Sequence, residues 1–192
     1  MIDPAFIQAM PKVELHVHLE GSIAPATLLE LARHNNVALP VATLDELREW
    51  YRFRDFPHFA EIYGTLSRCL RTVDDLEFIA RAFLAGQAEQ NIRYSEVTYT
   101  AFTQFRNYGL PYHEQLAALN RARRWGEETL GVAMGLIIDI PRQAGEDAGM
   151  LTAGWVIDSL GDGVVALGLG GIEVGHPPRK HAAAIARARQ AG

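Results

Sequence analysis

The stretch Pro11-Lys-Val-Glu-Leu-His-Val-His-Leu-Glu-Gly-Ser22 decides the fold that this sequence predicts. From Lys12 to Glu20, polar and aliphatic residues alternate without a break, and a period of two predicts a β-strand. The polar face is expected to line a polar interior, and the aliphatic face is expected to pack beneath helices. The polar face comprises Lys12, Glu14, His16, His18 and Glu20, and the aliphatic face comprises Val13, Leu15, Val17 and Leu19.

His16 and His18 predict a metal site on this strand. Residues two apart on a strand lie about 6 to 7 Å from each other at the backbone, so both imidazoles can reach one divalent ion. The alternative interpretation is a pair of hydrogen-bonded histidines on a half-exposed strand. The Glu-Gly-Ser turn that follows places the pair near the carboxyl end of the strand, where barrel enzymes carry their chemistry, and this favours the metal.

Composition limits the class of protein. The 192 residues are 48% hydrophobic, which suffices for a sizeable core, and the length predicts one domain or part of one. The formal net charge is -5 and no basic run occurs, so nucleic acid is not the expected partner. The densest basic cluster, Arg121, Arg123 and Arg124, is interpreted as a solvated helix face.

The single Cys69 excludes a disulfide framework and a cysteine-based zinc site within the chain, and it is interpreted as a core residue. Any metal must therefore rest on histidine and carboxylate ligands. Residues 1–10 carry neither a basic start nor a sustained apolar run, and no window has the length of a membrane span. These features predict a cytoplasmic protein that does not contact a membrane.

Four strand patterns, each followed by a helical one, predict an α/β fold with a parallel sheet of the TIM-barrel type. The first strand leads into a helix that has Pro25 in its first turn and ends at Asn35-Asn36. A closed barrel needs eight such units, so the sequence predicts residues 1–192 as the first four units, with the C-terminal half-barrel absent. The later strands are expected at 92–99, 131–140 and 164–169, the helices at 112–130, 145–160 and 179–190, and a loop before residue 112.

Residues 37–91 are predicted to form a helical, lid-like insertion after the first unit. The segment is too long for a loop and has no strand pattern. Two sequences that fit capping boxes, Thr43-Leu-Asp-Glu46 and Thr72-Val-Asp-Asp75, mark helix starts within it.

Between these two starts, Phe56, Phe59 and Tyr63 lie on one side of a helix that begins near Pro57. An aromatic stripe at helical spacing is more often part of a core than a ligand contact. The alternative is a lid, because helices inserted after the first unit lie over the carboxyl ends of the strands.

Three further positions bear on function. Glu96, the lone acid of its strand, is expected to be hydrogen-bonded or paired. The sequence Gly168-Leu-Gly-Gly171 fails the dinucleotide fingerprint, so a nucleotide cofactor is not expected. Gly171 is interpreted either as a tight turn with positive φ or as a close approach of backbone to a ligand. His176, which precedes two prolines, is interpreted as a loop residue.

The segment 10–23 resembles the opening signature of the adenosine and adenine deaminase family, in which the two histidines bind zinc. Phe56-Pro-His-Phe59 resembles the hydrophobic helix that this family places over its substrate. Gly170-Gly-Ile-Glu173 resembles the glycine motif of the fourth strand, and Glu173-Val-Gly-His-Pro-Pro178 is similar to the adenine deaminase-like branch. The resemblance spans the whole chain.

The resemblance implies one Zn²⁺ ligated by His16 and His18, and substrate contacts from His18, Glu20, Phe59 and the backbone N–H of Gly171. The implied reaction is the hydrolytic deamination of a 6-aminopurine at C6, with water activated by the zinc and ammonia released. Glu20 and the loop 173–178 favour adenine, or an N9-substituted adenine such as aminodeoxyfutalosine, over adenosine.

The family's His-Ala-Gly-Glu motif, its further catalytic histidine and its aspartate ligand do not occur in this sequence. By this resemblance the catalytic glutamate and histidine are expected beyond Gly192, where the fifth strand would begin. The chain alone is therefore expected to lack a catalytic acid or base and to be inactive without the missing C-terminal half-barrel.

Two alternatives stay open. One is a metal-dependent phosphoesterase that also begins with a His-x-His strand. The other is a non-catalytic truncated or split product that binds the missing half.

Overall fold

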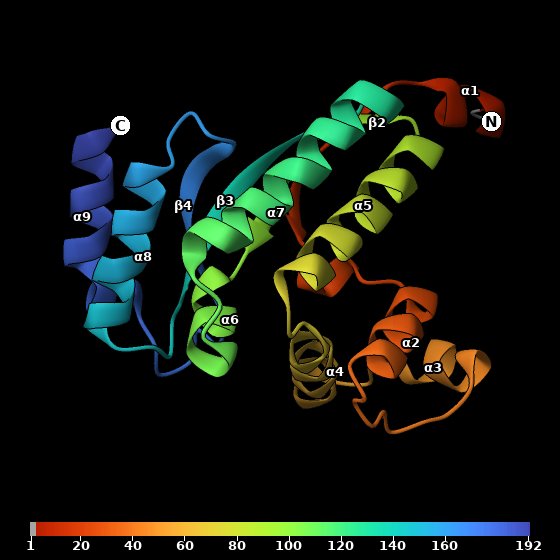
Figure 1. Cartoon of the computed structure of the whole chain (residues 1–192), viewed down its shortest axis with the longest axis horizontal. Coiled ribbons are helices and arrows are strands. Elements are labelled where there is room, and N and C mark those ends of the chain that lie inside the picture. The colour runs from red at the N-terminus through yellow and green to blue at the C-terminus, as the bar shows by residue number, and fades with distance from the viewer. Residues whose placement is uncertain (1–2) are drawn as a thin grey trace.

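The computed structural model describes residues 3–192, which form one four-stranded sheet with helices following each strand. All neighbouring strands are parallel and the order along the sheet is β1-β2-β3-β4. The predicted α/β class with four β/α units is confirmed, and β1 and β4 are the two edges of this open sheet (Figure 1). The strands are β1 (Lys12–His18), β2 (Ile92–Tyr99), β3 (Ala133–Pro141) and β4 (Val164–Gly170).

The helices differ in their relation to the sheet (Figure 1). In the outer layer, α5 runs beside α7 and α8 runs beside α9, and both α5 and α8 also contact strands. The helices α2, α3 and α4 form a separate group. In this group α3 and α4 both contact α2, and α2 also contacts α5. The helices are α1 (Pro4–Ala9), α2 (Pro25–His34), α3 (Leu44–Trp50), α4 (Phe56–Cys69), α5 (Val73–Glu89), α6 (Ala101–Tyr108), α7 (Tyr112–Trp125), α8 (Glu146–Asp158) and α9 (Ala182–Ala191), with shorter turns η1 (Glu20–Ser22), η2 (Gly126–Leu130) and η3 (Pro178–His181).

The segment 37–91 contains α3, α4 and α5, which have different surroundings. Both predicted capping boxes are confirmed: Thr43 caps α3 together with Glu46, and Thr72 caps α5 together with Asp75. The last of the three helices, α5, packs on β2 and α7 as part of the outer layer. The middle helix, α4, packs on η1 at the end of β1, so α4 is the helix of this segment that reaches the carboxyl ends of the strands.

The first half of β1 alternates as predicted, but its two faces are the reverse of those expected, since Lys12 and Glu14 are half-buried and Val13 and Leu15 are exposed. The pairing with β2 shifts twice. The first shift lies between Lys12 and Val13, and the second lies between Glu14 and Val17, where β1 carries one more residue than β2. Such bulges exchange the two faces of a strand. Val13 and Leu15 are 62% and 57% exposed, and Glu14 instead accepts a hydrogen bond from Gln87 of α5 at 2.6 Å.

Two other expectations fail in the helical layer. Residues 101–108, expected as a loop, form α6, which ends at Gly109 with a left-handed φ of 69°. Arg123 is not part of a solvated face, because its guanidinium donates to the carbonyl of Met134 at 2.5 Å and to Oδ1 of Asn120 at 2.8 Å. Its desolvation lowers the pKa of Arg123.

The core lies between the sheet and the helices that follow its strands. Its largest fully buried side chains come from β2, β3, α2, α3, α4, α5 and α7 and from two residues that directly follow β1 and α4, Leu19 and Leu70, and Cys69 is buried among them, as expected. Within residues 3–192, no helix combines the length and the apolarity that crossing a bilayer requires. The largest fully buried side chains are Leu19, Leu28, Leu31, Leu47, Leu66, Leu70, Leu76, Ile79, Leu84, Tyr99, Leu119 and Met134.

Candidate active site

One cavity of about 610 Å³ lies where the four strands end. Each strand contributes a residue to its lining: His18 from β1, Thr100 directly after β2, Asp139 from β3 and Gly170 from β4. Carboxyl ends of parallel strands meet at one edge of a sheet, which is why residues far apart in sequence converge here. The helix α4 completes the lining with the side chains Phe56, Phe59, Ala60 and Tyr63.

His16 and His18 lie side by side at the end of β1. Their ring centroids are 5.7 Å apart with an interplanar angle of 63°, although His16 lies within the irregular interval between Glu14 and Val17. His18 lines the cavity and meets the ring of Tyr63 edge-on, with centroids 6.3 Å apart. His16 is exposed beside it.

Glu20 is buried at the start of η1, two residues after His18. Its Oε1 accepts the backbone N–H of Thr100 at 3.1 Å, and its Oε2 has no hydrogen-bond partner. Burial, and next the charge of Asp139, raise the pKa of Glu20 to about 7, against the opposing effect of its hydrogen bonds. The structure thus holds a desolvated acceptor next to the cavity.

Asp139 is a second buried carboxylate, and it was not among the site residues predicted from the sequence. Its side chain is 2% exposed, lines the cavity, and has an Oδ1 without a hydrogen-bond partner. Burial raises the pKa of Asp139, whereas its hydrogen bond with Thr100 and the proximity of His18 act in the opposite direction. A signal was present in the sequence, because Asp139 is the only acid of an apolar strand and stands near its carboxyl end.

The aromatic stripe of α4 lies at the cavity and not in the core. Phe56 and Phe59 are 58% and 40% exposed, and the ring centroids of Phe59 and Tyr63 are 6.1 Å apart. Phe53, in the loop before α4, extends the row at 5.6 Å from Phe59. The opposite side of α4, which includes Ile62, is the side that packs into the core.

The backbone after β4 forms the far wall of the cavity. Gly171 has a φ of 104°, and a Cβ placed there would stand 2.5 Å from Oε1 of Gln143. The positive φ agrees with the tight-turn interpretation, and the place of Gly171 in the cavity lining is compatible with a ligand contact. Arg142 fixes this wall, since its N–H donates to the carbonyl of Gly170 at 2.8 Å and its side chain pairs with Glu173 at 2.6 Å.

Two other positions lie outside the site. Glu96 on β2 is half-buried and accepts a hydrogen bond from the hydroxyl of Tyr94 at 3.3 Å, as expected for a structural acid. His176 donates its backbone N–H to the carbonyl of Glu173 at 2.9 Å, within the loop between β4 and η3. Neither side chain lines the cavity.

Gly192 marks the point beyond which the catalytic glutamate and histidine are expected. It follows α9 directly as the residue that caps this helix, and it does not line the cavity. The carboxyl ends of β1 to β4 thus supply the cavity without any contribution from this end of the chain. The position of the expected acid and base beyond Gly192 stays a prediction.

The donors present fit part of a zinc site. Zinc takes imidazole nitrogen and carboxylate oxygen, and His16 with His18 offers two imidazoles at adjacent positions. Among residues 3–192, no group of three or more histidine, cysteine, aspartate or glutamate side chains is arranged to hold a metal ion. Two ligands leave room for others, so the pair fits as a portion of a coordination sphere.

The parallel sheet with its histidine pair and buried carboxylates at the strand ends corresponds to the first four β/α units of a barrel of the amidohydrolase type. The chain belongs to the adenosine deaminase family, whose model, described as adenosine deaminase, matches residues 11–192. The adenine deaminase of Rhodospirillum rubrum is 36% identical over 191 residues, which are 100% of this chain and 57% of that protein.

Solved structures agree with this assignment. The crystal structure of an adenine deaminase from Arthrobacter aurescens is 30% identical, with a TM-score of 0.84 over 96% of this chain and 56% of its own. A zinc-bound amidohydrolase from Burkholderia ambifaria is 29% identical, with a TM-score of 0.88 over 100% of this chain and 53% of its own. The chain therefore spans about half the length of the relatives it matches.

Proposed function

We propose that this chain is part of a zinc-dependent deaminase of 6-aminopurines. The observation that carries the proposal is the convergence of His18 and Asp139 at one cavity beneath the aromatic row of α4, with Glu20 buried next to it through its hydrogen bond to Thr100. The membership in the adenosine deaminase family and the similarity to proteins named adenine deaminase support the same reaction. The acid and base of the reaction are not assigned to residues of this chain.

Each site residue has a proposed role. His16 and His18 would hold the zinc, which when bound supplies the Lewis acidity for hydrolysis at C6. Glu20, whose Oε2 has no partner, would accept a hydrogen bond from the part of the substrate distant from C6. Gly171 would donate its backbone N–H to a ring nitrogen, and Phe59 would cover the purine ring, with the segment 37–91 acting as a lid through α4.

The charge of the cavity favours a substrate without phosphate. Among residues 3–192, none of those that line the cavity is a lysine or an arginine, and two carboxylates are buried beside it. A phosphoryl group is usually held by cations, so these surroundings favour a neutral base or nucleoside and argue against the phosphoesterase alternative. Adenine, adenosine and uncharged N9-substituted adenines fit this description.

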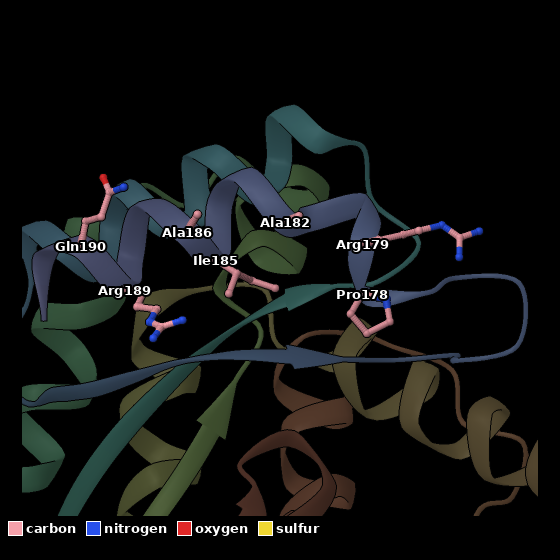
Figure 2. Close-up of a pocket in the computed structure, with 7 residues that line it drawn as sticks. All are labelled: Pro178, Arg179, Ala182, Ile185, Ala186, Arg189 and Gln190. Atoms are coloured by element: carbon pink, nitrogen blue, oxygen red, sulfur yellow. The ribbon is translucent and has the colours of Figure 1, made fainter.

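A complementary half-barrel is the proposed partner. Both edge strands are uncovered within residues 3–192: Val13 and Leu15 of β1 are exposed, and so is Val165 of β4. Figure 2 shows a groove along α9, next to β4, into which Ile185 points. A further β/α unit beside β4 would cover this groove.

A cytoplasmic location is part of the proposal, because Cys69 is a free thiol.

A chimera tests this function. Residues 1–192 are joined to the remaining part of the Rhodospirillum rubrum adenine deaminase, and the product is assayed with zinc on adenine, adenosine and aminodeoxyfutalosine. We expect deamination by the chimera, none by residues 1–192 alone, and a loss of at least about a thousandfold in the His16→Ala and His18→Ala chimeras. Turnover by residues 1–192 alone, or unchanged activity in the His18→Ala chimera, would contradict the proposal.

A further inference from the structure

Asp139 of β3 lies beside two glycines of β4 and next to His18. None of the functional roles proposed above involves Asp139. Asp139 pairs with Gly168 in the parallel register of β3 and β4, and Gly170 follows two residues later on the same side of β4. A Cβ at Gly168 would come within 3.0 Å of Cβ of Asp139, and a Cβ at Gly170 would collide with Oδ2 of its carboxylate. The two glycines thus provide the space that the Asp139 side chain fills.

The same space reaches the imidazole of His18. The Cβ position at Gly170 that meets the Asp139 carboxylate lies 3.7 Å from Cε1 of His18. Cε1 is the carbon between the two ring nitrogens, so this point of contact with the carboxylate lies near the part of the ring that carries them. Oδ1 of Asp139 is buried and has no partner, and it is therefore an acceptor available to an N–H donor in the cavity.

We propose that Asp139 is a positioning residue for His18: when His18 ligates the metal through one ring nitrogen, the Asp139 carboxylate accepts the other ring N–H, directly or through one water. Histidines that bind metals usually donate their second N–H to a carboxylate, a carbonyl or water, which fixes the tautomer and the ring orientation. This inference rests on the proposed function, because it takes His18 to be a metal ligand.

Three variants of the chain separate the possibilities. Asp139→Asn keeps the size of the side chain and removes its negative charge. Asp147→Asn makes the same chemical change on an exposed residue in the first turn of α8, outside the cavity. His18→Ala reports whether the imidazole binds zinc at all.

Each variant is made in the chimera described above, the metal-free protein is titrated with zinc alone, and the nitrogen chemical shifts of the histidine rings are followed by NMR. We expect Asp139→Asn to weaken zinc binding by about 10- to 100-fold and to shift the protonated ring nitrogen of His18, while Asp147→Asn behaves like the parent chain. A purely structural role of Asp139 would lower stability without moving the His18 ring signals, so the ring shifts distinguish the two roles.

The outcomes distinguish this inference from the function on which it rests. If His18→Ala binds zinc as tightly as the parent chain, the metal site itself is refuted. If His18→Ala loses zinc but Asp139→Asn retains both the parent affinity and the parent His18 shifts, only the role of Asp139 is refuted. Should Asp139→Asn fail to fold, Gly170→Ala provides the test: it displaces the carboxylate by crowding, and it must weaken zinc binding and move the His18 shifts, or the inference is wrong.

Discussion

The backbone N–H of Thr100 donates to Oε1 of Glu20 across 3.1 Å and so joins the end of β1 to the end of β2 at the cavity. Both partners are buried, and the second oxygen of Glu20 has no partner. A buried carboxylate that is only half satisfied is costly to keep. Glu20 is therefore a residue in which a binding role and a stabilising contact can be separated by mutation.

Glu20→Ala is expected to lower the free energy of unfolding by about 1 to 3 kcal/mol, because the N–H of Thr100 would remain buried without an acceptor. Glu20→Gln keeps an oxygen acceptor and removes the repulsion from Asp139, so its loss is expected to be smaller. Urea denaturation of the metal-free chain measures both values. Equal losses in the two variants would show that the hydrogen bond to Thr100 does not contribute to stability.

Phe59→Ala is expected to lower kcat/KM of the chimera for its purine substrate by up to about tenfold, because a ring that covers the substrate is removed. Phe53→Ala is the matched control. It belongs to the same row, 5.6 Å from Phe59 between ring centroids, but it does not line the cavity. Both side chains are at least 40% exposed, so the fold should tolerate either change. An equal loss in the two variants would rule out a specific role for Phe59.

Much of the fold was predictable because local signals and tertiary structure agree. The capping boxes at Thr43 and Thr72 specify helix starts through side-chain hydrogen bonds that need no distant partner. The apolar runs of β3 and β4 predict parallel strands, because strands covered on both faces lack alternation. The helix α6 was missed because its sequence, 101–108, gives no N-cap hydrogen bond and contains several polar residues.

The site was predictable only in part, for a different reason. His16 and His18 stand two residues apart, so spacing alone brings them together. Asp139 joins them through the barrel register, which no local pattern encodes. Val13 and Leu15 are exposed on an edge strand whose register against β2 shifts twice, and Phe56 and Phe59 are exposed where α4 lies over the cavity. Each of these depends on a neighbour that is remote in sequence.

Gly171→Ala is expected to lower the free energy of unfolding by about 1 to 3 kcal/mol and to raise KM of the chimera, because Ala must adopt a φ of 104° and would press on Oε1 of Gln143. Gly175→Ala, in the same loop with a φ of 80° and open space around it, carries the backbone cost without the crowding. Thermal unfolding and KM together measure the difference. A rise in KM of similar size in Gly175→Ala would mean that strain in the loop, and not the place of Gly171 in the cavity wall, controls binding.

Leu15→Lys tests the complementary half-barrel. Leu15 is 57% exposed on the edge strand β1, so the substitution should change the unfolding free energy of residues 3–192 by no more than about 0.5 kcal/mol. If a second half-barrel covers this edge, the lysine would be buried without a partner, and association would weaken by more than about tenfold. Val174→Lys, at 89% exposure in the loop after β4, is the control for added charge. Titration of each variant with the separately produced C-terminal half of the Rhodospirillum rubrum enzyme measures the affinity. Equal affinities for the two variants would place the partner away from β1, because a barrel closed by that half must bury the edge that carries Leu15.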